Sequence, residues 1–204
     1  MAPVYENGVV REVEDEYLYD PAILERLDFA KSGVKFNPPI SAAEPGAGLR
    51  IRPLSTRDYD RGFIKLLSQL TEVGDVSREQ FLKRFHEMKQ CPNTYFITVV
   101  EDTETANPED SVIGAATLVV EQKFIHQCAV RGRLEDVVVN DTYRGKQLGK
   151  LIVTTITMLA REMNCYKISL DCKDKMIPYY ESLGFTLEPG NSNYMTMRIL
   201  KCSL

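Results

Sequence analysis

The order of strand-like and helix-like segments predicts an α/β (α+β) fold, with a mixed central β-sheet flanked by helices on both faces. Three observations carry this prediction: a strand followed by two helices from residue 49, a central run of β-branched strands, and a later alternation of helix and strand. The 204 residues are 44% hydrophobic and 26% charged, which suits a single core and excludes collagen-like, coiled-coil and wholly disordered chains.

The first half of the predicted domain contains one strand and two helices. Leu49–Arg52 is predicted to be a strand. Ser55–Asp58 and Ser77–Gln80 both have the spacing of a capping box, so we expect a helix to follow each of them, and the second to end near Pro92. The apolar positions at helical spacing are Phe63, Leu66, Leu67 and Leu70 in the first helix, and Phe81, Phe85 and Met88 in the second.

The centre of the chain is rich in strand-forming residues. Tyr95–Val100 and Val112–Val120 flank a turn signal at Asn107–Asp110, which predicts a β-hairpin. Arg133–Val139 is predicted to be the next strand, and it leads into a long helix. That helix has one apolar stripe at Leu148, Ile152, Ile156, Leu159 and Met163.

The last segments complete the predicted sheet. We expect a strand at Tyr166–Leu170, a short helix at Met176–Leu183 with Pro178 in its first turn, and a final strand at Tyr194–Leu200. Gly184 follows the short helix, where glycine commonly forms the C-terminal cap.

Charge and composition narrow the classes of partner. The net charge of −4 provides no basic excess for a phosphate backbone, so we expect no nucleic-acid partner. Residues 1–46 contain nine acidic and four basic residues and several Pro and Gly positions, so they resemble a linker-like acidic extension. Asp20–Phe29 is the one place in this extension where a short docked helix is expected.

No segment suggests targeting or metal binding. We find no apolar run of transmembrane length, and the acidic start is unlike a secretory or transit signal, so we expect a cytoplasmic protein without a transmembrane segment. The five cysteines form no Cys-x-x-Cys pair, and the chain has only two histidines, so no metal site is expected. An odd number of cysteines also fits a reducing compartment.

Arg144–Gly149 lies between a predicted strand and the long helix, where free amides and the helix dipole attract anions. Gly145 and Gly149 allow close approach of the backbone, while Arg144, Lys146 and Lys150 add positive charge. The spacing matches neither a P-loop nor a dinucleotide-binding turn. On these residues alone, an ordinary turn with solvated cations is the stronger interpretation.

In context, this loop resembles the Arg/Gln-x-x-Gly-x-Gly/Ala signature of the GNAT superfamily of acetyl-CoA-dependent N-acetyltransferases. The resemblance implies a GNAT acyltransferase fold over residues 47–204, acetyl-CoA as cosubstrate and no metal. It implies that the loop holds the coenzyme's pyrophosphate through Arg144, Gly145, Lys146, Gln147, Leu148, Gly149 and Lys150, and that Val137, Val138 and Val139 bind the pantetheine arm. Gln147 occupies the first glycine position of the signature. Its backbone amide is still available, so we expect coenzyme binding to survive provided that Gln147 has ordinary helical dihedrals, which need no glycine.

Further segments resemble one branch of the superfamily, whose members acetylate the amine of glucosamine 6-phosphate. This resemblance spans roughly residues 49–200, and it implies that the products are N-acetylglucosamine 6-phosphate and CoA, within UDP-N-acetylglucosamine biosynthesis. It also implies a homodimer in which the partner contributes to the sugar site. The segments are Leu70–Gly74, Lys123–His126, Leu134–Val139, Cys165–Ile168, Leu170–Cys172 and Tyr179–Phe185.

The resemblance places the substrate-binding residues in these segments. Lys123, Lys167 and Arg198 supply cations suited to a phosphate. Sugar hydroxyls need polar neighbours, for which the candidates are Thr71, His126, Glu135, Asp136 and Tyr166. Taken singly, the lysines and the arginine are equally well explained as surface charges, and His126 as a core histidine.

The catalytic assignment also follows from the resemblance. Glu135 is assigned as general base, the backbone carbonyl of Asp171 orients the amine, and Tyr180 stabilises or protonates the departing sulfur. Adjacent acids on a strand normally face opposite sides, so we expect a bulge to turn Glu135 and Asp136 to the same side. Transfer is expected to be direct, within a ternary complex. A route through an acetylated Cys172 is the internal rival.

Two other functions remain open at this point. One keeps the fold but changes the acceptor to a polyamine or a protein amine, which the predicted cations disfavour because such an acceptor needs an acidic groove. The other is a catalytically silent acetyl-CoA-binding module that uses its acidic extension for protein contacts. Glu135 and Tyr180 disfavour it.

Overall fold

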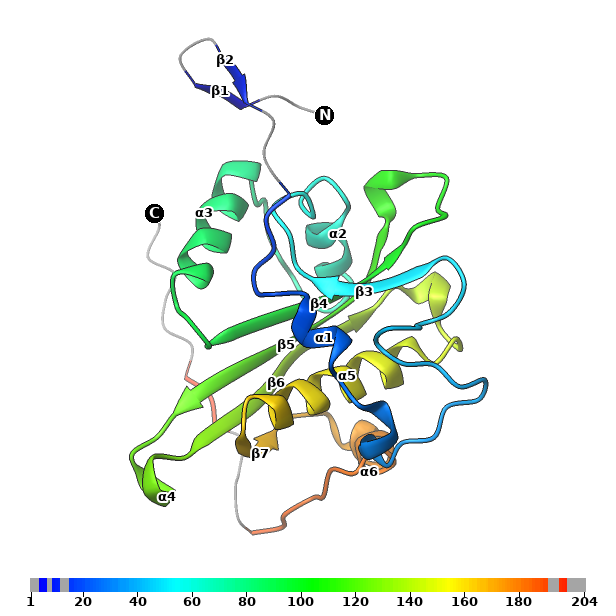
Figure 1. Cartoon of the computed structure of the whole chain (residues 1–204), viewed down its shortest axis with the longest axis vertical. Coiled ribbons are helices and arrows are strands. Elements are labelled where there is room, and N and C mark those ends of the chain that lie inside the picture. The colour runs from blue at the N-terminus through cyan, green and yellow to red at the C-terminus, as the bar shows by residue number, and fades with distance from the viewer. Residues whose placement is uncertain (1–3, 7–8, 12–14, 191–194, 198–204) are drawn as a thin grey trace. The chain divides into compact units, whose positions relative to one another are not determined.

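The computed structural model describes residues 4–6, 9–11, 15–190 and 195–197 (Figure 1). They belong to two compact units, Met1–Leu170 and Asp171–Leu204. The first unit contains the β-sheet and the long helix. The second contains two short helical segments.

A five-stranded sheet organises the first unit, in the order β3-β4-β5-β6-β7. All neighbours are antiparallel except β6 and β7, which are parallel, so the predicted mixed sheet is confirmed. The strands are β3 (Leu49–Pro53), β4 (Tyr95–Asp102), β5 (Val112–Gln122), β6 (Val130–Val139) and β7 (Cys165–Ser169). The separate hairpin of β1 (Val4–Glu6) and β2 (Val9–Arg11) is antiparallel.

Helices cover both faces of this sheet, as predicted. The helices α2 (Phe63–Leu67) and α3 (Arg78–Lys89) pack on one face, where Phe63, Phe81 and Phe85 join strand residues in a buried cluster. The helix α5 (Leu148–Glu162) lies on the opposite face (Figure 1). Gly132 of β6 lies in a tightly packed place, because a Cβ at this position would come within 3.0 Å of Leu118 Cδ1 and would be in ordinary contact with the Ala160 Cβ.

Of the two predicted capping boxes, one is present. Ser77 Oγ accepts from the Gln80 amide and Gln80 Oε1 accepts from the Ser77 amide, which caps α3. The box at Ser55–Asp58 is wrong: α2 begins only at Phe63, after Gly62. Asp58 Oδ2 does accept from the Ser55 amide at 2.7 Å, which is half of a capping box, but the same carboxylate also accepts two hydrogen bonds from the buried Arg52 guanidinium, and no helix starts at Ser55.

The apolar stripe of α5 is confirmed over most of its length. Leu148, Ile152, Ile156 and Leu159 are buried, whereas Met163 follows the helix and is half-buried. Among the described residues, no helix is both long and apolar enough to cross a membrane.

The N-terminal segment is packed rather than linker-like from residue 15 onwards. The Leu18 amide donates to the Leu54 carbonyl at 2.9 Å, and Leu18, Leu24 and Ala42 are buried. The expected short helix is α1 (Ala22–Glu25), and η1 (Phe29–Ser32) follows it. The linker-like interpretation is therefore wrong for residues 15–46, while the domain boundary at residue 46 stays a prediction.

The second unit contains η4 (Asp174–Met176) and α6 (Ile177–Glu181), with Pro178 in the first turn as predicted. Gly184 has φ +91°, and the amides of Gly184 and Phe185 donate to the carbonyls of Glu181 and Tyr180. This is the Schellman arrangement, so the predicted glycine cap is confirmed. The predicted strand 194–200 falls mostly outside the described residues, and Met195–Met197 have no strand assignment.

Candidate active site

A β-bulge on β6 positions the two predicted carboxylates. Glu135 pairs with Thr117 and Val138 pairs with Ala115, so two residues of β6 lie opposite one residue of β5. Asp136, in the bulge, has φ +52°. Both Asp136 and Thr117 line the same cavity, and Glu135 shares the face of its partner Thr117. The predicted bulge, which turns both acids to one face, is confirmed.

The two carboxylates have different electrostatic surroundings. Arg133 Nε forms an ion pair with Glu135 Oε1. Asp136 is exposed as a residue, but partial burial of its carboxylate and, secondarily, the negative charge of Glu135 raise its pKa. Arg133 was not among the predicted site residues, although strand alternation would have placed it on the same face as Glu135.

The cavity beside Asp136 has a volume of 260 Å³ and lies between α2, α3 and the sheet. Its lining is largely apolar, with Phe63, Phe81 and Phe85 among the contributing side chains. Val73, from the connection between α2 and α3, also lines it, whereas the predicted substrate residue Thr71 is exposed and is not part of the lining. A partly desolvated carboxylate at the edge of an apolar cavity suits proton transfer.

The C-terminal half of β6 has a free backbone edge. The strand β7 pairs with β6 only over Val130–Arg133, and none of the described residues up to Leu170 forms a strand against that edge beyond Arg133. The predicted pantetheine residues Val137, Val138 and Val139 lie in this stretch, with Val138 buried in the core. An extended amide-bearing ligand can add to such an edge by main-chain hydrogen bonds.

The glycine-bearing loop leads from η3 (Asp141–Tyr143) into α5. Gly145 has φ +83° and Gln147 has φ +60° and ψ +10°. The condition of ordinary helical dihedrals for Gln147 is not met, because its backbone is left-handed, as a glycine there would readily be. The Leu151 amide makes the first intrahelical bond, to Gln147, which leaves the amides of Leu148, Gly149 and Lys150 directed towards the loop.

The cations of this loop differ in where they point. Arg144 pairs with Asp141, and Lys146 Nζ lies 4.7 Å from the centre of the Tyr143 ring. Lys150 Nζ donates to the carbonyl of Lys35, in the N-terminal segment. The predicted loop residues therefore lie together, but the Lys150 ammonium binds the N-terminal segment instead.

A second group of predicted residues gathers near the end of the β5–β6 hairpin. The rings of His126 and Tyr166 lie 5.0 Å apart, and Lys167 Nζ lies 5.8 Å from the Tyr166 ring. Lys123 Nζ forms an ion pair with Glu121 at 2.6 Å. The turn α4 (Ile125–Cys128) has positive φ at His126, so its helical character is irregular.

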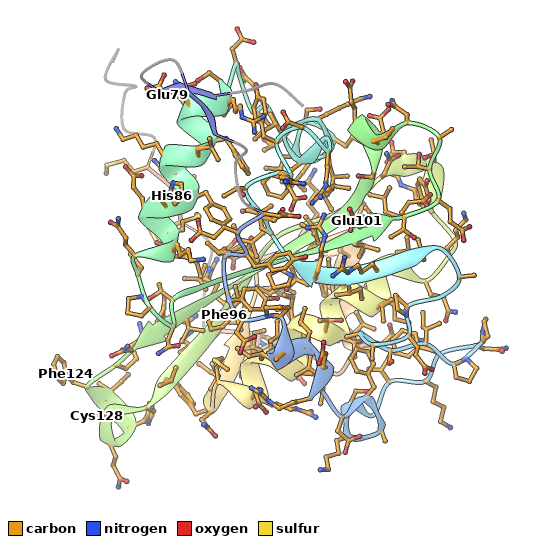
Figure 2. All side chains as sticks on the ribbon, turned by 45° about the horizontal axis from the view of Figure 1, so that its top comes forward. Glu79, His86, Phe96, Glu101, Phe124 and Cys128 are labelled. Carbon is orange, nitrogen blue, oxygen red and sulfur yellow. The ribbon has the colours of Figure 1, made fainter. Side chains whose placement is uncertain are left out.

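The hairpin group does not adjoin the bulge. In the register of β6 and β7, Lys167 lies opposite Arg131. Arg131 precedes Glu135 by four residues, which is roughly 13 Å of strand. Phe124 and Ile125 at the hairpin turn are 96% and 61% exposed, and Figure 2 shows Phe124 and Cys128 at its extremity. These two side chains form an exposed apolar pair at the turn.

The second unit carries the remaining predicted catalytic groups. Burial, aided by the charge of Cys172, raises the pKa of Tyr180, whose ring makes edge contacts with Tyr179 and Phe185. The pKa of the Cys172 thiol is raised by burial and by Asp174 and Asp171, which disfavours a nucleophilic thiolate. Asp171 is exposed. Arg198 lies outside the described residues.

Comparisons with known proteins agree with this arrangement. The model of the Acetyltransferase (GNAT) family matches residues 62–185. The chain is 62% identical over 191 residues to a probable glucosamine 6-phosphate N-acetyltransferase of Drosophila melanogaster, covering 93% of this chain and 85% of that protein. It is 39% identical to glucosamine 6-phosphate N-acetyltransferase 1 of Dictyostelium discoideum, covering 68% of this chain and 85% of that protein.

A solved structure gives the same result. The crystal structure of glucosamine-6-phosphate N-acetyltransferase from Arabidopsis thaliana has a TM-score of 0.67 and 35% identity, and the match covers 74% of this chain and 97% of that one. The chain therefore belongs to the GNAT family of acetyltransferases and, within it, to the glucosamine 6-phosphate N-acetyltransferases.

Proposed function

We propose that this protein transfers the acetyl group of acetyl-CoA to the amine of D-glucosamine 6-phosphate, forming N-acetyl-D-glucosamine 6-phosphate and CoA. The observation that carries the proposal is the bulge on β6, which turns Glu135 and Asp136 to one face, next to a free strand edge and an anion-binding loop. The names of the Drosophila and Dictyostelium relatives supply the acceptor.

The proposed chemistry is a direct transfer. Glu135, directly or through a water molecule, accepts a proton from the ammonium group, and the free amine attacks the thioester carbonyl, oriented by the carbonyl of Asp171. A C–N bond forms, the nitrogen releases its second proton to water, the C–S bond breaks, and the thiolate takes a proton from Tyr180, which water then restores. The raised pKa of Tyr180 supports this role, because the hydroxyl stays protonated at neutral pH. The raised pKa of Cys172 argues against an acetyl-cysteine intermediate.

The sugar site is proposed to need two copies of the chain. Lys123, His126, Tyr166 and Lys167 are candidates for the phosphate and hydroxyl groups, together with Thr71, Asp136 and Arg198. Because the hairpin group lies roughly 13 Å along β6 from Glu135, it cannot readily serve the same sugar within one copy. The exposed Phe124 and Ile125 support a homodimer at this end.

A cytoplasmic location, a role in UDP-N-acetylglucosamine biosynthesis and the absence of a nucleic-acid partner belong to the same proposal.

The deciding experiment varies the acceptor. CoA release is measured with glucosamine 6-phosphate, unphosphorylated glucosamine, spermidine and a lysine peptide. We expect turnover with the phosphorylated sugar and at least about a hundredfold lower kcat/KM for the others, because charged hydrogen bonds to phosphate are lost. Equal rates with and without the phosphate, or a preference for spermidine or the peptide, would refute the proposed acceptor.

Glu135→Gln tests the base within the same assay. We expect kcat to fall about a hundredfold. Glu104→Gln, an exposed change in the loop after β4, is the control and should keep the parent's kcat. An unchanged kcat in Glu135→Gln would remove Glu135 from the mechanism without affecting the choice of acceptor.

A further inference from the structure

The segment Lys31–Asn37, here called the strap, contacts α5 at both ends of the helix. At the far end, Arg161 Nη1 donates to the Lys31 carbonyl at 2.6 Å. At the near end, Lys150 Nζ donates to the Lys35 carbonyl and lies 5.0 Å from the centre of the Phe36 ring. The strap therefore runs antiparallel to α5 and ends beside the coenzyme loop.

The last contact of the strap is with Gln147. The side-chain Nε2 of Gln147 donates to the Asn37 carbonyl at 2.8 Å, and its Oε1 accepts from the Asn37 amide at 3.3 Å. Both hydrogen-bonding groups of the Gln147 amide are thus engaged by one residue of the strap. Because the partners are main-chain atoms, the contact depends on the side chain of Gln147 and not on that of Asn37.

The backbone of Gln147 also has an unusual conformation. It has φ +60°, a conformation that non-glycine residues rarely adopt unless their surroundings hold it. Glycine would reach this conformation without cost but could not bind the strap. Gln147 combines the left-handed backbone with a side chain that ties the loop to a packed segment.

We propose that Gln147 is a positioning residue for coenzyme binding, and that the strap is part of the coenzyme site because it holds Gln147 in place. The inference rests on the proposed function, in which the loop binds the pyrophosphate of acetyl-CoA. Holding Gln147 fixes the direction of the amides of Leu148, Gly149 and Lys150 before the ligand arrives, which reduces the ordering cost of binding. The N-terminal segment thereby acquires a role in the acetyltransferase reaction.

Two variants distinguish the effect of the Gln147 side chain from the effect of its backbone conformation. Gln147→Gly keeps an easy left-handed backbone but loses both bonds to Asn37. Gln147→Ala loses the bonds and keeps the conformational cost. If only the backbone conformation mattered, the glycine variant would bind coenzyme at least as tightly as the parent, whereas a role for the strap predicts weaker binding in both. Gln127→Gly is the matched control, because Gln127 also has φ +60° but lies in the turn α4.

The full chain and its variants are compared by calorimetric titration with coenzyme A and by hydrogen exchange of the amides of residues 31–37 and 145–151. In Gln147→Gly we expect faster exchange of the strap without ligand, and a Kd for coenzyme A about tenfold higher, because binding must then order the loop that the strap no longer holds. The KM for acetyl-CoA should rise by about the same factor with kcat nearly unchanged, because Gln147 does not touch the reacting atoms. Gln127→Gly should keep the parent's Kd.

The possible failures are distinguishable. If coenzyme A protects residues 145–151 in the parent but Gln147→Gly binds it as tightly as the parent, the strap proposal is overturned and the proposed function stands. Unchanged exchange of residues 31–37 in Gln147→Gly would overturn the strap proposal in the same way. If coenzyme A gives no protection of residues 145–151 in the parent, the coenzyme site itself is wrong and both proposals fall.

Discussion

Arg52 and Asp58 form a buried two-point ion pair, in which Nη1 and Nη2 of Arg52 each donate to a different carboxylate oxygen of Asp58 at 2.8 Å. Arg52 Nε also donates to Glu101 Oε2 at 2.8 Å, and the Ser55 amide donates to Asp58 at 2.7 Å. The cluster fastens the strand β3 to its neighbour β4 and to the turn before α2. Since its members are paired, their burial is tolerated, but removal of one member leaves a charge without compensation.

Asp58→Asn should therefore destabilise the fold strongly. We expect the free energy of unfolding to fall by about 3 kcal/mol, because the Arg52 charge keeps only Glu101 as a fully charged close partner. Urea denaturation followed by circular dichroism measures it. Asp110→Asn, which breaks the solvent-exposed pair with Lys65, is the control and should have a much smaller effect. Similar losses for the two variants would contradict the role given to the buried cluster.

The same cluster predicts sensitivity to acid. Burial works against the ionised form of Glu101, but the hydrogen bond and charge of Arg52 outweigh it and lower the pKa below its ordinary value of 4.5. A carboxyl whose pKa is lowered by folding stabilises the protein above its unfolded pKa, and this stabilisation disappears as the pH falls through the folded value. We expect Glu101→Gln to be less stable than the parent at pH 7 and to approach it at the acid end, in urea titrations at a series of pH values. A stability difference that grew with acidity would contradict this sign.

The two expected helix caps, at Ser55–Asp58 and Ser77–Gln80, show which features the sequence could predict. Ser55–Asp58 has the local pattern of a helix cap, and Ser77–Gln80 has the same kind of pattern, yet only the second is a cap. The Ser55 amide still donates to Asp58, but no helix follows there, because Asp58 is also bound by the buried Arg52 in a tertiary ion pair that the local pattern does not contain. Strand periods, the α5 stripe and the bulge were predictable because each arises within one or two neighbouring segments.

The coenzyme loop also has contacts that local sequence patterns do not predict. Its residues were identified from their spacing, but the contacts of Gln147 with Asn37 and of Lys150 with Lys35 involve a segment more than a hundred residues earlier in the chain. No local pattern in Lys31–Asn37 predicts these contacts. Their hydrogen bonds end on main-chain atoms of Lys35 and Asn37, which every sequence possesses. Packing of this kind becomes visible only in the folded chain.

Asp136→Asn should increase stability. Burial and the charge of Glu135 raise the pKa of Asp136 above its ordinary value of 3.8, so the ionised carboxylate is disfavoured in the folded state. At pH 7 that cost is present, and a neutral amide removes it. The urea midpoint of Asp136→Asn should exceed that of the parent at pH 7, and the difference should vanish below pH 3.8, where the aspartate is protonated in both states. A lower midpoint at pH 7 would mean that the carboxylate makes a stabilising contact.

Tyr180→Phe should slow turnover with little effect on folding. The aromatic contacts with Tyr179 and Phe185 survive the change, while the hydroxyl proposed to protonate the sulfur is lost. We expect kcat to fall about a hundredfold and the KM for the sugar to change little. Tyr179→Phe is the matched control: burial and the neighbouring Tyr180 raise its pKa to about 12, but it has no proposed part in the chemistry. Equal loss of kcat in both variants would indicate a packing effect.

Gly62→Ala should be far more damaging than Gly74→Ala. Both glycines have a left-handed backbone, with φ +87° and +75°, so an alanine meets the same conformational cost at either position. A Cβ at Gly62 would additionally collide with the main-chain carbonyl of Glu109, whereas a Cβ at Gly74 would meet no atom within 4 Å. Because main chain cannot rotate away like a side-chain end, we expect Gly62→Ala to lose about 2 kcal/mol more of the free energy of unfolding than Gly74→Ala. Urea titration of the two proteins measures the difference, and equal losses would show that the turn before α2 and the turn at Glu109 are not packed as closely as the structure has them.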